Sequence, residues 1–172
     1  MSEVIATNFY FLIKRLADIV IAGLIFVILL PLFIPIVLLL KLTGEGEVFY
    51  KQDRVGYKNQ IFQIWKFATM LRNSPNMGTG DVTLRNDSRV TFIGKFLRIS
   101  KLNELPQIIN ILKGDMTLVG PRPLMKAGWA RYSEFHKANV YNVRPGLTGI
   151  GSIVFRDEEK IMTDSDLPPH EC

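Results

Sequence analysis

The chain has 172 residues, of which 48% are hydrophobic and 22% are charged, and its formal net charge is +5. This length accommodates one compact domain and one membrane element. The single cysteine, Cys172, excludes both an intramolecular disulfide and a cysteine-based metal site. The two histidines, His136 and His170, lie far apart in sequence and are better explained as ordinary surface or core residues than as metal ligands.

The first part of the chain contains a long apolar segment, because no residue from Ile19 to Leu40 is charged. Spanning a bilayer takes about 20 apolar residues, so the length suffices. The run is longer than the apolar region of a signal peptide, about 7–15 residues, and no small-residue cleavage site follows it. We therefore predict a membrane element over residues 1–42 and a separate domain over residues 43–172.

Two prolines interrupt this segment and suggest how it sits in the membrane. Pro31 and Pro35 each remove an intrahelical hydrogen bond, so a break or sharp kink is expected. Both flanks are basic, with Lys14 and Arg15 before the segment and Lys41 after it, and basic flanks prefer the cytoplasm. A helix broken near Pro31 can enter and leave on the same side. We therefore favour a re-entrant hairpin over a kinked span or a buried core helix.

The remainder reads as a small α/β domain that is mostly helical. Gly114 is a plausible stop for a helix that Asn103 would cap at its N-terminus. A polar tail without a fold of its own is expected from Thr163. The hydrophobic periodicity predicts the following elements: strands at 48–50 and 60–67 joined by a turn at 54–59, a loop at 74–81, and helices at 91–99, 104–112 and 123 to about 138.

Basic residues are concentrated between Arg85 and Arg144, where eleven Lys or Arg face only four Asp or Glu. Such a surface suits the phosphates of a ligand, an anionic membrane or nucleic acid. The alternative is a solvated surface with a modest bias. Nucleic acid is disfavoured, because the basic residues flank proline-rigid turns rather than line one helix face, and no nucleic-acid-binding motif is present.

Several of these residues are candidates for a phosphate site. Arg122 lies between two prolines and Arg144 precedes another, so both have stiff backbones that suit phosphate recognition. Lys66 follows a strand-like run, and Glu104 lies at the start of a predicted helix. A carboxylate such as Glu104 or Asp115 beside these cations could hold Mg²⁺ against a diphosphate. Purely structural roles, in turns and at helix ends, are the alternative for each residue.

Together, these residues belong to a set of motifs that resembles the monotopic phosphoglycosyl transferases. These are bacterial sugar transferases that begin the assembly of capsular, exopolysaccharide, O-antigen and glycoprotein glycans. The resemblance extends over residues 12 to 157. Its motifs, in the family's order, are KRLAD at 14–18, FYKQDRVG at 49–56, WKFATM at 65–70, LNELPQ at 102–107, LKGDM at 112–116, VGPRP at 119–123 and VRPGLTG at 143–149.

The resemblance implies a re-entrant helix and a catalytic domain lying on the cytoplasmic face of the bacterial inner membrane, in contact with membrane lipids. It also implies a Mg²⁺-dependent reaction in two steps. A carboxylate attacks the diphosphate of a UDP-sugar and releases UMP, and the phosphosugar then passes to undecaprenyl phosphate. By the same resemblance, Glu104 performs metal binding and acid–base work, and the substrate-binding residues are Lys66, Arg98, Arg122 and Arg144.

The chain departs from the family pattern at two positions in these motifs. Asn103 occupies the position of the nucleophilic Asp, and an amide cannot form an acyl-phosphate. Ala68 stands where the family usually has Arg or Lys. In addition, family members usually continue beyond the position of Cys172, which suggests a truncated C-terminus. Three hypotheses follow: an enzyme with altered chemistry in which Glu104 is the nucleophile, an inactive relative that still binds ligands or partners, or a deliberately altered sequence.

Overall fold

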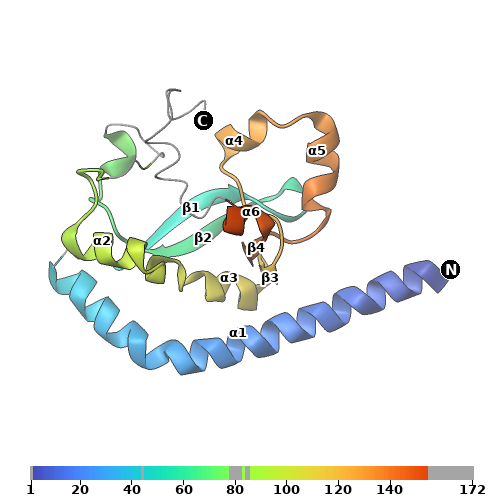
Figure 1. Ribbon diagram of the computed structural model, residues 1–172, viewed down its shortest axis with the longest axis horizontal. Helices are drawn as coiled ribbons and strands as arrows, with labels where there is room; N and C mark the ends of the chain where they lie inside the picture. The colour runs from blue at the N-terminus through green and yellow to red at the C-terminus, as the bar shows by residue number, and fades with distance from the viewer. Residues whose placement is uncertain (1, 44, 78–82, 84–85, 155–172) are drawn as a thin grey trace.

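The computed structural model describes residues 2–43, 45–77, 83 and 86–154. One long helix runs beneath a small domain of short helices and strands (Figure 1). The prediction of a mixed helix-and-strand chain with a long apolar N-terminal helix is therefore confirmed. The tail predicted from Thr163 and part of the loop predicted at 74–81 lie outside the described residues.

The N-terminal helix, α1 (Ser2–Thr43), continues through both Pro31 and Pro35, so the structure does not confirm a break there. A proline removes only its own backbone donor, and the bonds on either side can hold the helix together while it bends. Figure 1 shows this bend between the dark-blue and light-blue parts of α1.

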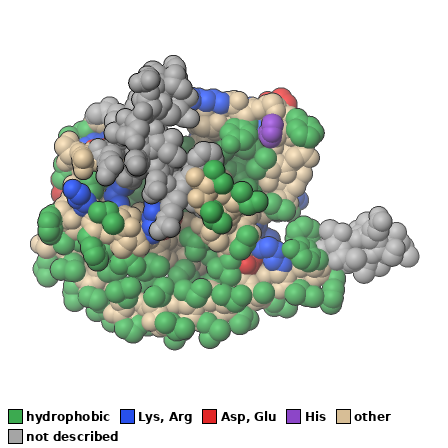
Figure 2. Space-filling view, in the orientation of Figure 1, with side chains coloured by type: hydrophobic (Ala, Val, Ile, Leu, Met, Phe, Trp, Pro, Cys, Tyr) green, Lys and Arg blue, Asp and Glu red, His purple; other side chains and the backbone are tan. Residues whose placement is uncertain are grey.

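The surface of α1 is mostly apolar and exposed. The part over Phe9–Thr43 contains an 18-residue window with a mean hydropathy of 3.1, of which only 17% is buried. Hydrophobic side chains cover the lower side of the molecule in Figure 2, where α1 lies. By length and composition, α1 could cross a membrane, and its exposure argues against the alternative of a buried core helix.

Two apolar clusters hold α1 against the domain. They use opposite halves of the helix, so α1 contacts the domain on both sides of its bend. The clusters have these members: Ala22 with Ile64, Ile108, Ile111 and Met116 in the first, and Phe33, Ile36 and Leu40 with Phe67 and Leu97 in the second.

Polar contacts dock the basic N-terminal half of α1. Asp18 is buried and accepts hydrogen bonds from Thr117 Oγ1 at 2.5 Å and from the Leu118 amide at 3.2 Å. Arg15 donates to two carbonyls in the last turn of α3 (Gln107–Lys113), at 2.7 and 3.1 Å. The carbonyls of the last helical turn have few partners within the helix, although the Ile111 carbonyl also accepts from the Gly114 amide at 3.1 Å. A cation at this end of the helix also interacts favourably with the helix dipole. The KRLAD motif thus joins α1 to the domain.

Strands β1 (Phe49–Val55) and β2 (Ile61–Phe67) form an antiparallel hairpin with Val55 opposite Ile61. The predicted turn between them is present and contains a 3-10 turn at Tyr57–Asn59. β1 is longer than the three residues predicted, because its polar second half still pairs with β2 through backbone hydrogen bonds.

A second, parallel pair was not predicted: β3 (Thr117–Val119) lies beside β4 (Gly146–Thr148). Two glycines permit this contact, because a Cβ on Gly120 would lie 2.5 Å from the Arg144 carbonyl and one on Gly146 would lie 2.1 Å from the Gly120 nitrogen. The VGPRP and RPGLTG motifs therefore pack backbone against backbone.

The short helices agree only partly with prediction. α2 (Phe92–Ile99) is confirmed, and Thr91 caps it by accepting from the Gly94 amide. Gly114 ends α3 with φ +98°, also as predicted. The prediction that Asn103 is an N-cap was wrong, because a 3-10 turn at Leu102–Glu104 contains Asn103, and α3 starts only after Pro106.

The single helix predicted from 123 to about 138 was also wrong. The chain forms two helices there, because Ser133 leaves the helical conformation and caps the second one. The remaining short elements are α4 (Lys126–Ala130), α5 (Glu134–Asn139), α6 (Ile150–Val154) and 3-10 turns at Ser74–Asn76 and Val140–Asn142.

Candidate active site

The centre of the candidate site is an ion pair between Lys66 on β2 and Glu104 at the end of the 3-10 turn before α3. Lys66 Nζ lies 3.5 Å from Glu104 Oε1, at the long end for a hydrogen bond. The two side chains are 20% and 34% exposed. The pair is therefore loose and mostly buried, and each side chain keeps a partly exposed surface for a ligand.

Three arginines lie close enough to Lys66 for their positive charges to act on its ammonium. Burial lowers the pKa of the Lys66 ammonium, and the charges of Arg54, Arg122 and Arg98 lower it further, although Glu104 acts in the opposite direction. Nearby positive charges destabilise the Lys66 ammonium, so a bound anion would stabilise it. Three arginines near a lysine that also pairs with a carboxylate form a positive site that suits a diphosphate.

Glu104 is held in its ionised form. Burial would raise the pKa of its carboxyl, but Lys66 first and then Arg122 and Lys101 outweigh burial and keep the pKa below its ordinary value. At neutral pH this carboxylate is therefore available as a nucleophile, a base or a metal ligand.

Tyr141 positions the turn that carries Arg122. Its hydroxyl donates to the Arg122 carbonyl at 2.8 Å and accepts from the Leu124 amide at 3.0 Å. The ring is 1% exposed and packs against Trp129, with 4.6 Å between ring centroids. Arg54 Nη1 adds a bond to the Pro123 carbonyl at 3.1 Å. Sequence reasoning missed Tyr141, since one tyrosine between two turns has no distinguishing pattern.

Arg98 is placed by the packing of α2 against the end of β2. Its Nη1 lies 3.5 Å from Thr69 Oγ1. The Thr69 carbonyl accepts from the Thr91 amide at 3.0 Å, and a Cβ on Gly94 would come within 2.0 Å of the same carbonyl oxygen. The glycine thus lets α2 approach the backbone that follows Lys66.

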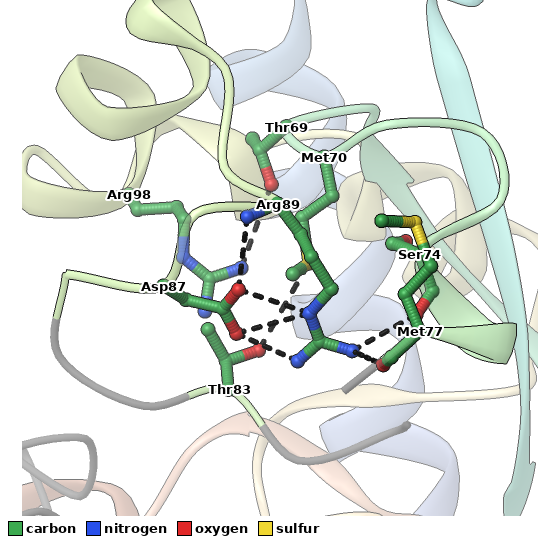
Figure 3. A network of polar contacts seen from close by, with 8 residues as sticks. All are labelled: Thr69, Met70, Ser74, Met77, Thr83, Asp87, Arg89 and Arg98. Atoms are coloured by element: carbon green, nitrogen blue, oxygen red, sulfur yellow. Dashed lines mark hydrogen bonds and ion pairs between the residues drawn. The ribbon is translucent and has the colours of Figure 1, made fainter. Parts of the chain in front are cut away.

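A buried ion pair lies beside Arg98 (Figure 3). Arg89 Nη2 is 2.6 Å from Asp87 Oδ2, and both side chains are almost completely buried. Arg89 Nη1 also donates to the carbonyls of Ser74 and Met77 at 2.9 and 2.8 Å. This network ties the segment before α2 to the segment after β2, and sequence reasoning did not identify it.

Asn110 of α3 supports the strand that carries Lys66. Its Oδ1 accepts from the Trp65 amide at 2.9 Å, and its Nδ2 donates to the Gln63 carbonyl at 2.7 Å. The side chain thus pairs with the backbone of β2 as a neighbouring strand would. An asparagine beside the apolar residues Ile108 and Ile111 was the available signal for this role.

Asn103 is only 7% exposed, and its Oδ1 has no hydrogen-bond partner among the described residues. A buried acceptor without a donor costs about 1–3 kcal/mol, so the position gains from a ligand donor or a cation. The structure therefore gives Asn103 no capping role and leaves its oxygen available.

Two other candidates lie at the opposite end of α3. Arg144 Nε donates to the Gly114 carbonyl at 2.8 Å, and its guanidinium lies 5.2 Å from the centroid of the Tyr57 ring. Asp115 accepts from Asn110 Nδ2 at 3.1 Å. The structure thus brings Lys66, Glu104, Arg98 and Arg122 together. Asp115, after α3, and Arg144, before β4, have structural contacts instead. Within the described residues no three His, Cys, Asp or Glu side chains gather as a metal site.

A family model described as bacterial sugar transferase matches residues 9–167, and the chain belongs to this family.

Named relatives agree with the family assignment. The chain is 38% identical over 160 residues, 90% of its length, to UDP-N-acetylgalactosamine-undecaprenyl-phosphate N-acetylgalactosaminephosphotransferase of Aeromonas hydrophila. It is 39% identical over 144 residues, 83% of its length, to UDP-glucose:undecaprenyl-phosphate glucose-1-phosphate transferase of Escherichia coli K12. It spans only 37% and 31% of these two relatives. It covers 72% of exopolysaccharide production protein ExoY of Sinorhizobium fredii, at 35% identity over 167 residues, which are 87% of the chain.

Proposed function

We propose that the chain transfers a sugar 1-phosphate from a UDP-sugar to undecaprenyl phosphate and releases UMP, as the first membrane step of glycan assembly. The observation that carries this proposal is the loose Lys66–Glu104 pair in the field of Arg122 and Arg98. The names of the relatives specify UDP-sugars and undecaprenyl phosphate, and the family assignment supports the same reaction class here.

The cations bind the diphosphate and stabilise the charge that develops during transfer. Lys66, Arg98 and Arg122 supply donors to phosphate oxygens, and Arg122 is held on a stiff, doubly anchored turn. Preorganised donors of this kind need no rearrangement as the transition state forms. Arg144, which anchors the end of α3, acts on the site through the fold.

Glu104 carries the transfer in this chain. Its carboxylate oxygen forms a bond to the phosphorus that bears the sugar, and the bond from that phosphorus to UMP breaks. A phosphate oxygen of undecaprenyl phosphate then attacks the same phosphorus and frees Glu104. Asn103 has no anionic oxygen and cannot perform this step. Glu104 is the carboxylate that the described structure holds beside Lys66 and Arg122.

The residues present also fit Mg²⁺. Glu104 offers a carboxylate and the adjacent Asn103 an oxygen without a partner, and Mg²⁺ commonly uses one or two protein oxygens together with substrate phosphates. When bound, the ion would neutralise charge on the diphosphate. Ion-pairing with Lys66 keeps Glu104 ionised before any cation arrives.

A second candidate function is ligand binding without transfer, and the amide at Asn103 is the observation that favours it. The two functions differ in turnover. We expect purified chain with Mg²⁺ and undecaprenyl phosphate to release UMP from a UDP-sugar slowly, and Glu104→Gln to abolish the release. Binding of UDP-sugar with no UMP above the Glu104→Gln background would instead establish the second function.

We further propose that α1 enters and leaves the cytoplasmic leaflet of the inner membrane on one side. Its exposed apolar surface, its bend and the basic residues on both sides of its uncharged stretch (Lys14 and Arg15 before it, Lys41 after it) support this arrangement. Exposed Phe92, Phe96 and Ile99 give α2 an apolar surface for the same lipid phase.

Cysteine labelling tests this topology in a Cys172→Ser background. Cysteines placed at the exposed positions Tyr10 and Ala127 should both resist a membrane-impermeant maleimide in intact cells and react after lysis. Labelling of position 10 alone in intact cells would mean that α1 spans the membrane.

A further inference from the structure

A cavity of about 290 Å³ lies where the end of α1 meets the start of α2. This volume is at the small end of ligand pockets, about 300–1,000 Å³, so it suits part of a molecule rather than a whole nucleotide sugar. The lining residues are Leu40, Thr43, Glu45, Glu47, Ala68, Met70, Arg72, Thr91, Phe92 and Ile93.

The lining combines apolar residues and two threonines with three charged residues, Glu45, Glu47 and Arg72, that contact one another. Arg72 Nε lies 3.0 Å from Glu47 Oε1, and the Arg72 amide donates to the Glu45 carboxylate. The lining contains two carboxylates and one guanidinium, so its net charge is negative and unfavourable for phosphate. Leu40, Met70 and Ile93 present hydrocarbon and sulfur surfaces instead. The charge and lining therefore favour an uncharged apolar occupant.

Ala68 keeps this cavity open. Ala68 is one of the residues that line it, and a longer side chain at this position would extend into the space that the alanine methyl leaves free. Ala68 also links the cavity to the cation cluster, because it lies two residues after Lys66 and directly before Thr69, the contact of Arg98. Through Ala68, the cavity thus lies near the cations that hold the acceptor phosphate in the proposed function.

The cavity also adjoins the apolar side of the molecule. Leu42 at the end of α1 and Phe92 at the start of α2 are 80% and 90% exposed, and Phe96 and Ile99 continue this surface along α2. A hydrocarbon chain can therefore run from the cation cluster along Leu40, Met70 and Ile93 in the cavity to this exposed apolar surface.

We propose that this cavity binds the head-proximal isoprenoid units of the polyprenyl phosphate acceptor, and that Ala68 determines whether they fit. The inference rests on the proposed function, since it gives a site to the acceptor of that reaction. It concerns the chain of the acceptor and not its phosphate, which the cations hold. A larger residue at 68 should exclude the chain and leave nucleotide binding intact.

Photocrosslinking tests the proposal without requiring turnover. The full chain in phosphatidylethanolamine–phosphatidylglycerol nanodiscs is irradiated with a diazirine-bearing farnesyl phosphate, and labelled peptides are mapped by mass spectrometry. We expect labels at residues 40–43 or 91–93, competed by undecaprenyl phosphate but not by added phosphatidylglycerol. Ala68→Trp should lower this labelling at least fivefold, whereas Ala127→Trp, on exposed α4, should leave it unchanged.

Calorimetric UDP binding serves as the folding control, and Ala68→Leu, a smaller addition, is used if Ala68→Trp has lost UDP binding. Labelling that is unchanged in the UDP-binding Ala68 variant, that maps elsewhere, or that phosphatidylglycerol competes equally would overturn the proposal. Specific labelling in a chain that releases no UMP would refute transfer while supporting the acceptor-chain site.

Discussion

Two ion pairs in this domain contain the same kinds of group in opposite settings. Asp87 and Arg89 are 2.6 Å apart and almost fully buried, and Arg89 also binds two carbonyls. Lys66 and Glu104 are 3.5 Å apart and partly exposed. The first pair is satisfied internally and joins two segments. The second pair leaves charge available to a ligand. The comparison teaches that geometry and burial, rather than residue type, separate a structural pair from a functional one.

Removing Arg89 should have the largest effect on stability. Arg89→Met leaves the Asp87 carboxylate buried without its partner, which costs about 3–5 kcal/mol. We expect a clearly lower thermal transition in detergent, and partial recovery in the Asp87→Asn/Arg89→Met double variant. An Arg89→Met variant as stable as the parent would show that the buried pair does not stabilise the fold.

Lys66→Met should instead have a large effect on ligand binding and a small effect on stability. Loss of a charge-assisted bond to phosphate, about 1.5–3 kcal/mol, predicts UDP binding about 10- to 100-fold weaker. Stability should change little, because burial already disfavours the ammonium. Calorimetric titration with UDP measures the first effect and thermal unfolding the second. Lys113→Met, an exposed lysine at the end of α3, is the matched control and should bind UDP normally.

The lowered pKa of Lys66 predicts opposite pH trends for binding and stability. Between the folded pKa and the ordinary value of about 10.4, the folded chain binds fewer protons than the unfolded chain, so stability rises with pH from this group. UDP affinity, which uses the ammonium, should fall over the same interval. Lys66→Arg should remove this decline, and a decline that persists in Lys66→Arg would assign it to another group.

The lowered pKa of Glu104 predicts how stability changes at acidic pH. Its pKa is lowered, so the stability it contributes is present above the ordinary carboxyl pKa and is lost as pH falls through the folded value. The thermal unfolding temperature of the parent should therefore fall more steeply with decreasing pH than that of Glu104→Gln. Parallel curves would contradict the ionised state assigned to Glu104.

Tyr141→Phe should have the smallest effect, because the ring and its packing remain. The loss of bonds to the Arg122 carbonyl and the Leu124 amide predicts about 1 kcal/mol of destabilisation. The looser turn should also weaken UDP binding severalfold through Arg122. If Tyr141 only stabilises the fold, stability will fall while UDP affinity remains that of the parent.

Local chemistry made some elements predictable from sequence. The amphipathic pattern of residues 91–99 indicated α2, and Gly114 after an apolar periodic run indicated the end of α3, because both signals depend on neighbouring residues. Asn103 misled the same reasoning, because the Pro106 that follows it starts α3 later and leaves Asn103 in a 3-10 turn. The β3–β4 pair depends on residues nearly thirty positions apart, which periodicity does not reveal.

The residues of the candidate site also fall into two groups, those that local sequence patterns identify and those that only the structure identifies. Glu104 and the proline-flanked Arg122 were identifiable from their motifs, and Lys66 and Arg98 were named with them. Arg144 has a similar local pattern, yet it lies at the other end of α3, because proline neighbours indicate a rigid turn but not where the turn packs. Asn110, Tyr141 and the Asp87–Arg89 pair act through contacts distant in sequence, so only the structure identifies them.

The central claim is that the Lys66–Glu104 cluster is a phosphosugar-transfer site whose rate is limited by the amide at Asn103. The most direct test compares UMP release by the parent and by Asn103→Asp, with Mg²⁺, undecaprenyl phosphate and a panel of UDP-sugars. Restoring a carboxylate nucleophile should raise the rate by about 10³-fold or more, within the range seen when nucleophiles are removed from enzymes. Equal rates, or no release by either protein despite UDP-sugar binding, would contradict the claim.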